Sequence, residues 1–207
     1  MIELVQMNPA YSPAPILGVL AGPSGSGKTT LTDMIVRRSP FRRCITTTTR
    51  PPRDGEVDGV HYRFLSPFQF ALREQCGEFI ETALVHGRKY GTRRADLVSA
   101  LRRYGKVILN IDVQGYLNLK AHADGEIQEA MLGVFITVPG PDVYATFRRR
   151  ISAREPDIAP EELARRLETA KWELDRTSAF DCIIVNDDRE KAVTQILRAL
   201  MTASIPR

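Results

Sequence analysis

The sequence has few of the residues that build disulfide frameworks and metal centres. It contains three cysteines and three histidines in 207 residues. Cys44, Cys76 and Cys182 lie far apart, and an odd number of cysteines fits poorly with a set of disulfides. No pair of cysteines has the spacing of a zinc site, and the histidines form no ligand pattern. We therefore expect reduced thiols and a cytoplasmic protein.

Long apolar runs and a strong charge excess are also missing. No apolar stretch approaches the roughly 18 residues of a membrane span. The N-terminal residues 1–14 contain Glu3, Pro9 and Pro13, do not resemble a signal peptide, and are expected to be a tail or a short extra element. The net charge of +4 suits an anionic ligand but is too small to indicate a nucleic-acid binder. We expect neither a membrane nor a nucleic acid as partner.

Apolar runs and segments of helical spacing alternate along most of the chain. The runs with strand character are residues 16–21, 106–112, 132–138 and 182–185. The segments with helical character are residues 28–38, 93–104, 114–122, 142–152, 160–176 and 189–200. This alternation predicts an α/β fold with a doubly wound parallel sheet flanked by helices. The ligand of such a sheet lies at the carboxyl ends of its strands.

Residues 41–92 break this alternation and are expected to form an inserted small subdomain. A helix is predicted over 66–76, where Ser66 is a suitable N-cap and Pro67 suits the first helical position. Further along, residues 150–163 are charged and contain two prolines. We expect this second segment to be a mobile cover.

The most informative motif of the chain is Gly22-Pro23-Ser24-Gly25-Ser26-Gly27-Lys28-Thr29. It lies between a predicted strand and a predicted helix, which is the setting of a phosphate-binding loop. Its glycines let successive backbone N–H groups turn toward one point, and the helix start adds its positive dipole end. Lys28 would reach the β- and γ-phosphates, and Thr29 would place its hydroxyl on Mg²⁺. The motif predicts binding of a nucleoside triphosphate; a plain glycine turn is the alternative, which the flanking elements disfavour.

A second phosphate site is indicated by the stretch Thr46 to Glu56. Two prolines stiffen it, and Arg50 and Arg53 stand three residues apart around them. Guanidinium groups held in this way suit a phosphate better than a flexible lysine does. Tyr62 and Tyr90 are candidates for additional hydroxyl donors. A solvated basic loop would explain the composition equally well.

Seven motifs occur in one order between about Ile16 and Leu200. They are the phosphate loop, T-T-R-P-P-R-D-G-E, G-V-H-Y-R-F, G-E-F-I-E, Y-G-T, I-D-V-Q-G and V-N-D-D. Together they resemble guanylate kinase, a nucleoside monophosphate kinase. The resemblance implies one domain over residues 1–207, with a core at about 16–45, 96–147 and 166–207. It also implies a GMP-binding subdomain at about 46–95 and a lid at about 148–165.

The resemblance also implies ATP + GMP ⇌ ADP + GDP, with dGMP as a further acceptor, and assigns the site residues. The residues assigned to ATP binding are Gly22, Pro23, Ser24, Gly25, Ser26, Gly27, Lys28, Thr29, Thr30 and Asn186. GMP binding falls to Thr46, Arg50, Arg53, Tyr62, Glu81, Tyr90, Thr92 and Asp112. Catalysis falls to Lys28, Arg50, Arg150, Arg154 and Arg166. The implied cofactor is Mg²⁺, held directly by Thr29 and through water by Asp112.

The preference for one nucleobase in the acceptor follows from hydrogen bonding at Glu81. A carboxylate matches the adjacent N1–H and amine donors of guanine, whereas adenine presents an unprotonated N1 there. A site built around a buried polar partner discriminates by about 10⁴ or more. The resemblance therefore implies a strong preference for GMP over AMP, CMP and UMP.

Three departures from the family pattern affect these expectations. Asn110 stands where an acidic residue is usual, two positions before Asp112, and brings no charge to Mg²⁺. Thr82 follows Glu81 where tryptophan is frequent, which loses packing. In the lid, Ala153-Arg154-Glu155-Pro156 replaces G-R-G and makes Arg154 the least certain assignment.

Other functions were weighed against the same residues. A non-catalytic binding module typically has a degraded phosphate loop, but Lys28 and Thr29 are intact. A kinase with another small-molecule acceptor would need neither Glu81 nor the arginine-rich stretch. A nucleic-acid binder would rest on the basic pI alone. The sequence leaves the oligomeric state open, a homo-oligomer included.

Overall fold

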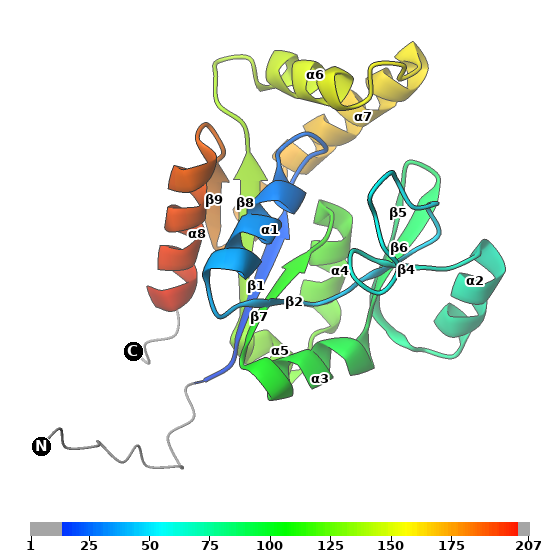
Figure 1. The fold of residues 1–207 in the computed structure, drawn as a ribbon, viewed down its shortest axis with the longest axis vertical. Coiled ribbons are helices and arrows are strands. Elements are labelled where there is room, and N and C mark those ends of the chain that lie inside the picture. The colour runs from blue at the N-terminus through cyan, green and yellow to red at the C-terminus, as the bar shows by residue number, and fades with distance from the viewer. Residues whose placement is uncertain (1–13, 203–207) are drawn as a thin grey trace, which may run out of the picture.

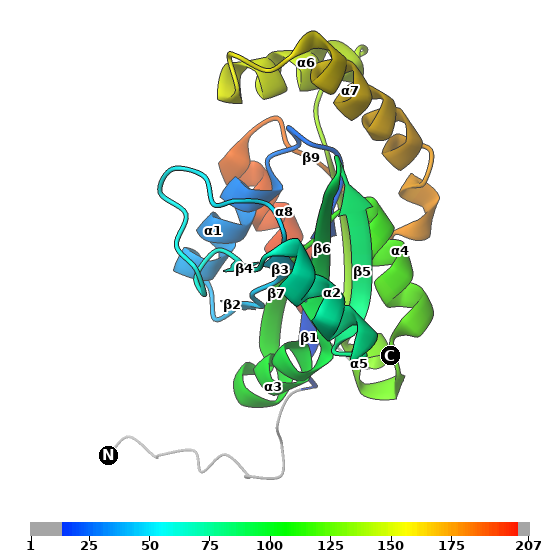
Figure 2. The same ribbon diagram turned by 90° about the vertical axis from the view of Figure 1, so that its right-hand side faces the viewer.

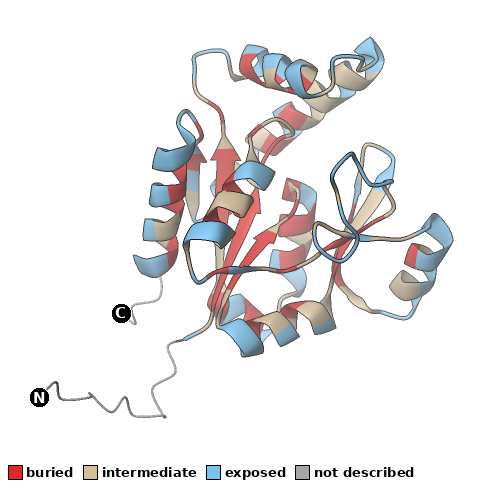
Figure 3. Ribbon diagram, viewed as in Figure 1, coloured by how far each residue is buried: buried red, intermediate tan, exposed pale blue. Residues whose placement is uncertain are grey.

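A parallel sheet forms the centre of the computed structural model, which describes residues 14–202. Within those residues its order is β2 (Arg42–Arg43), β7 (Lys106–Asn110), β1 (Ile16–Ala21), β8 (Met131–Thr137) and β9 (Cys182–Val185). All four neighbouring pairs run parallel. Every residue of β1 is buried, because a central parallel strand is covered on both faces and its sequence is a continuous apolar run. Figure 3 shows this buried centre in red.

Helices cover both faces of the sheet (Figures 1 and 2). On one face pack α1 (Lys28–Arg38) and α8 (Arg189–Thr202), which share a buried cluster with Leu20 and Ile136. On the other pack α3 (Arg94–Tyr104), α4 (Val113–His122) and α5 (Gly125–Ala130), which surround Val19 and Leu109. Among the residues from 14 to 202, no helix is both long and apolar enough to cross a bilayer. The predicted doubly wound α/β fold is confirmed.

A second sheet lies beside the first. Its order is β4 (Arg63–Phe64), β3 (Thr47–Thr48), β6 (Arg88–Arg93) and β5 (Phe79–Val85), with α2 (Pro67–Gln75) outside it. The predicted start of α2 is confirmed: Ser66 accepts a hydrogen bond from the Gln69 backbone, and the Gln69 side chain accepts one from the Ser66 backbone. Phe70 of α2 stacks on Phe79 of β5 with ring centroids 4.5 Å apart. These elements fall inside the subdomain predicted at residues 46–95.

The helices α6 (Val143–Arg154) and α7 (Pro160–Leu174) stand above the carboxyl ends of the central strands (Figure 2). Phe147 and Ile151 of α6 pack with Ala170 of α7 and with Val138, which follows β8. Both helices extend past the predicted lid limits of 148 and 165. The short helix η1 (Thr177–Ala179) connects α7 to β9.

Two expectations need correction or restriction. The strand predicted over 106–112 ends at Asn110, because Asp112 caps the next helix and accepts a hydrogen bond from the Gly115 N–H at 2.9 Å. The helix α5 was not expected at all. The tail predicted at 1–14 lies, apart from Ala14, outside the described residues.

Candidate active site

A cavity of about 1110 Å³ opens where the central strands end. It lies between the phosphate loop, the small sheet and the helix pair α6–α7. The predicted residues on its wall are Gly22, Ser24, Gly25, Gly27, Lys28, Thr29, Thr30, Thr46, Arg50, Arg53, Tyr62, Tyr90, Asp112, Arg150, Arg154, Arg166 and Asn186. Residues from three separate parts of the chain therefore meet there. Pro23, Ser26, Glu81 and Thr92 are not on the wall.

The phosphate loop is shaped to present free N–H groups. Gly27 caps α1 in the left-handed region at φ 94° and offers no side chain to the helix start. A Cβ at Gly27 would lie 2.3 Å from the Asn186 amide nitrogen, so glycine is required there. That buried amide donates a 2.7 Å hydrogen bond to the Ser26 carbonyl. Asn186 therefore braces the loop, and the first turn of α1 remains available to an anion.

Two polar side chains of this loop, Lys28 and Ser26, differ in their hydrogen bonding. Lys28 Nζ donates to the carbonyls of Gly22 and Pro23, at 2.5 and 3.2 Å. The Ser26 hydroxyl is buried and has no hydrogen-bond partner among the described residues. A buried hydroxyl without a partner is unfavourable unless a ligand or water completes it. The position of Lys28, which lines the cavity, fits a loop that receives a phosphate.

The protonation of Lys28 is affected by burial and by two nearby carboxylates. Burial lowers the pKa of Lys28, while the carboxylates of Glu173 and Asp112 act in the opposite direction. Glu173 lies on α7 with 5% of its surface exposed, and burial raises its pKa to about 7 despite the nearby Lys28. Glu173 is not among the residues predicted from the sequence. The available signal was its spacing, because Arg166, Ala170 and Glu173 stand at i, i+4 and i+7 and share one helix face.

Polar groups that could hold Mg²⁺ lie at the start of α1. Asn110 donates its side-chain amide to the Thr29 hydroxyl at 3.4 Å, and Asp112 lines the same cavity. Burial raises the pKa of Asp112, and the charge of Lys28 opposes this effect. No group of three or more His, Cys, Asp or Glu side chains in residues 14–202 could hold a metal alone. The donor set fits Mg²⁺ that shares its coordination with nucleotide phosphates and water.

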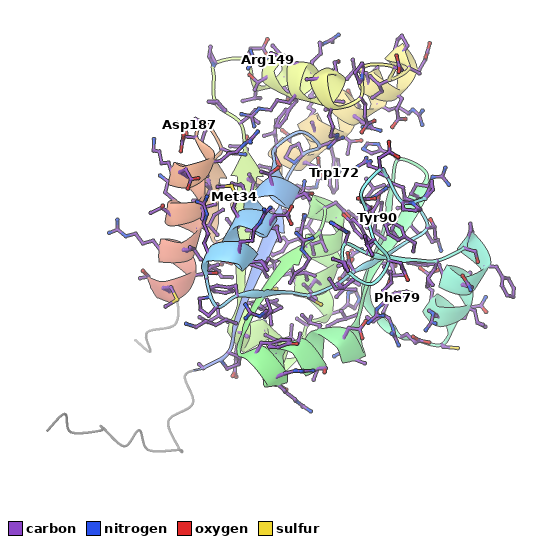
Figure 4. All side chains as sticks on the ribbon, in the orientation of Figure 1. Met34, Phe79, Tyr90, Arg149, Trp172 and Asp187 are labelled. Carbon is purple, nitrogen blue, oxygen red and sulfur yellow. The ribbon has the colours of Figure 1, made fainter. Side chains whose placement is uncertain are left out.

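The arginine-rich stretch is held by hydrogen bonds to Glu56, although residues 51–55 are exposed. Arg50 pairs with both oxygens of Glu56 at 2.8 Å, and its guanidinium carbon lies 5.4 Å from the centre of the Tyr62 ring. Tyr62 meets Tyr90 edge to face at 6.2 Å (Tyr90 is labelled in Figure 4). Both phenols and both predicted arginines, Arg50 and Arg53, line the cavity. The loop and the two tyrosines beside it can therefore present two guanidiniums and two hydroxyls to the cavity.

Glu81 and Thr92 lie behind this wall. The Thr92 hydroxyl donates to the Glu81 carboxyl at 2.6 Å across β5 and β6, and both residues are buried. The other carboxyl oxygen approaches α4 so closely that a Cβ at Gly115 would lie 2.8 Å from it. Burial raises the pKa of Glu81 to about 8. Thr46, by contrast, lines the cavity.

The lid arginines reach different partners. Arg150 donates to the Asn186 carbonyl at 2.8 Å, and Arg154 donates to the Ser24 hydroxyl at 3.3 Å. Arg166 on α7 pairs with Glu155 and Glu162, both at 2.9 Å. Arg149, labelled on α6 in Figure 4, is exposed and does not line the cavity. The helix α6 therefore contacts the phosphate loop through Arg154 and contacts Asn186, which braces that loop, through Arg150.

Comparisons with known proteins agree with this geometry. The family model described as guanylate kinase matches residues 15–203. The guanylate kinase of Helicobacter pylori is 37% identical over 185 residues, which cover 89% of this chain and 85% of that protein. The guanylate kinase of Thermus thermophilus is 40% identical over 187 residues, which cover 90% and 80%. A crystal structure of guanylate kinase from Anaplasma phagocytophilum matches with a TM-score of 0.75 and 26% identity, over 94% of this chain and 89% of that one. The chain belongs to the guanylate kinase family.

Proposed function

We propose that this protein transfers the γ-phosphoryl group of ATP to GMP, and to dGMP, giving ADP and the nucleoside diphosphate. One observation carries the proposal: a single cavity joins an intact phosphate loop to the Arg50–Arg53 stretch. Two phosphate-binding regions facing one space suit a reaction between two phosphates. We place the reaction in the cytoplasm, with ATP and GMP as small-molecule partners.

The acceptor in this reaction is already an anionic phosphate oxygen, so no strong general base is needed. The task of the protein is to bring two polyanions together and to stabilise the charge that spreads over the transferring group. Lys28, the lid arginines Arg150 and Arg154, and Arg166 of α7 would serve the transferring group. Arg50 and Arg53, with the two tyrosine hydroxyls, would hold the acceptor. Mg²⁺ held at Thr29, with Asp112 acting through water, would neutralise charge on the ATP phosphates.

The base of the acceptor would be read by Glu81, supported by the hydroxyls of Thr92 and Thr46. The Thr92 hydroxyl already holds one carboxyl oxygen. Since Glu81 is buried, a base that offers no donors would leave its carboxylate unsatisfied, which is costly.

The direct test is ADP release from ATP and Mg²⁺ with GMP, dGMP, AMP, CMP and UMP supplied separately. We expect fast release with GMP and dGMP and near-background release with the other three. Saturable GMP binding without turnover would contradict the proposal and favour a binding module. Equal turnover of all five acceptors would contradict the role of Glu81.

GMP binding should release a proton between pH 6 and 8. The free Glu81 carboxyl is protonated below its pKa of about 8, whereas guanine needs the carboxylate as acceptor. GMP affinity should therefore rise as the pH increases toward 8 and level off above it. Calorimetry in buffers of different ionisation enthalpy measures the proton directly.

The control for this pH dependence is Glu81→Gln, which should retain only the titration of the GMP phosphate near pH 6. Identical proton release in the two proteins would contradict the assignment.

Asn110→Asp should strengthen the apparent affinity for Mg²⁺ in the kinase assay by about tenfold, since a carboxylate replaces a neutral amide beside Thr29. The measurement is the Mg²⁺ dependence of ADP release at fixed ATP. GMP affinity without Mg²⁺ serves as the control and should not change. An unaltered Mg²⁺ dependence would show that Asn110 is outside the coordination sphere.

A further inference from the structure

Glu155, at the end of the lid helix α6, binds three of the arginines assigned to phosphates. Its carboxylate lies 2.9 Å from the guanidinium of Arg154, 2.9 Å from that of Arg166 and 3.3 Å from that of Arg53. The three cations come from α6, from α7 and from the loop after β3. One carboxylate therefore connects both lid helices to the small sheet's side of the cavity.

This cluster has the composition of a phosphate site with a protein carboxylate in place of the phosphate. Glu155 keeps 28% of its side chain exposed. Burial alone would raise the pKa of Glu155, but the hydrogen bond from Arg166 and the charges of Arg154 and Arg53 hold it below its usual range. Glu155 is thus an anion at neutral pH.

Arg50 shows the same type of internal pairing, with Glu56. That pair is formed within one loop. Glu155 and Arg53 are instead 102 positions apart, and their contact joins two parts of the molecule on opposite sides of the cavity. The contact can form only while the lid is near the small sheet.

We propose that Glu155 is an internal competitor of the substrate phosphates: it holds the lid to the GMP-binding side while the site is empty and is displaced when a phosphate binds Arg53. This inference rests on the proposed function for the identity of the phosphate. The displacement weakens GMP binding, because the ion pair between Glu155 and Arg53 is lost when Arg53 binds the GMP phosphate. Glu155 competes only with the phosphate of GMP, so binding of the guanine base is not affected.

The test is calorimetric titration of the Glu155→Gln protein with GMP and with guanosine. Exposed ion pairs are weak, so loss of the competing charge should tighten GMP binding by about three- to fivefold. Guanosine affinity should not change. Salt weakens the ion pairs of GMP in both proteins, but in the wild-type protein it also weakens the competing pair of Glu155. GMP affinity should therefore fall more steeply with added salt in the variant.

Asp157→Asn is the matched control, since it removes the same charge from an exposed lid position two residues away. It should bind both ligands like the wild-type protein. Hydrogen exchange of residues 153–159 supplies a second readout: without ligand it should be faster in Glu155→Gln than in the wild-type protein, and with GMP it should be equal.

GMP affinity that is unchanged or weaker in Glu155→Gln, or guanosine affinity altered by the same factor, would overturn the proposal. Equal hydrogen exchange of the two ligand-free proteins would overturn the holding contact. Because binding is measured without turnover, failure of the proposed kinase activity would appear separately, as absence of ADP release in the wild-type protein.

Discussion

Lys28→Met should lower the rate of GMP phosphorylation by about 10²–10³-fold, the loss typical when one preorganised charge-stabilising donor is removed from an active site. Methionine matches the length of lysine but carries no charge. The ammonium group now rests on the carbonyls of Gly22 and Pro23, inside the loop that would surround the ATP phosphates. The variant should therefore lose stabilisation of the transferring group, and the measurement is kcat with saturating ATP and GMP.

Lys120→Met is the control for this substitution. Lys120 also donates to a backbone carbonyl, that of Ala179 at 2.6 Å, but it does not line the cavity. Its variant should keep full activity. GMP affinity should be retained in both variants, because Arg50 and Glu81 are untouched. A Lys28→Met protein with kcat within threefold of the wild type would show that this lysine does not act on the reacting phosphates.

Glu81→Gln should reduce the preference for GMP over AMP from about 10⁴ to about 10²-fold or less. The amide offers one acceptor where the carboxylate offers two, so one of the guanine donors is left unsatisfied. The ratio of kcat/KM for the two acceptors measures the effect, and most of the change should lie in the GMP value. Glu74→Gln, which removes a surface carboxylate of α2 paired with Lys89, is the control and should leave the ratio unchanged.

The same substitution has a second expected effect, on stability. Burial raises the pKa of Glu81 from 4.5 to about 8, so the folded state binds a proton more tightly than the unfolded state. The free energy of unfolding attributable to this group therefore falls as the pH rises from about 4.5 to 8. Glu81→Gln should unfold at a higher temperature than the wild type at pH 8, and the two should converge near pH 4. Unchanged GMP selectivity together with unchanged stability at pH 8 would contradict the placement of Glu81.

The parts of the fold that the sequence predicts are those encoded locally. The apolar run of β1, the glycines before α1 and the cap of α2 at Ser66 each depend on neighbouring residues, and each is confirmed. The end of β7 was placed too late because Asp112 has two competing local roles, as the end of an apolar run and as a helix cap. The cap prevails because it satisfies free N–H groups of α4.

The candidate site was predicted unevenly for a related reason. The resemblance supplied residue types in order, but the buried pair Glu81–Thr92 depends on the register of β5 against β6. The brace of Asn186 on Ser26 joins residues 160 positions apart. Glu173 carries no motif and becomes informative only once α7 is seen to bring it beside Lys28. Contacts between residues so far apart in the sequence depend on how the strands and helices are arranged in space. That arrangement cannot be inferred from any single segment of the sequence.

The helix α7 has the shape of a lever arm between the predicted lid and the phosphate loop. It begins at Pro160 in the lid and reaches Glu173 beside the phosphate loop without interruption, a length of about 20 Å at 1.5 Å per residue. A rotation of about 10° around the buried Glu173 would carry the Pro160 end by about 3.5 Å. Any such rotation would therefore move the lid end of α7 much further than the end beside Lys28.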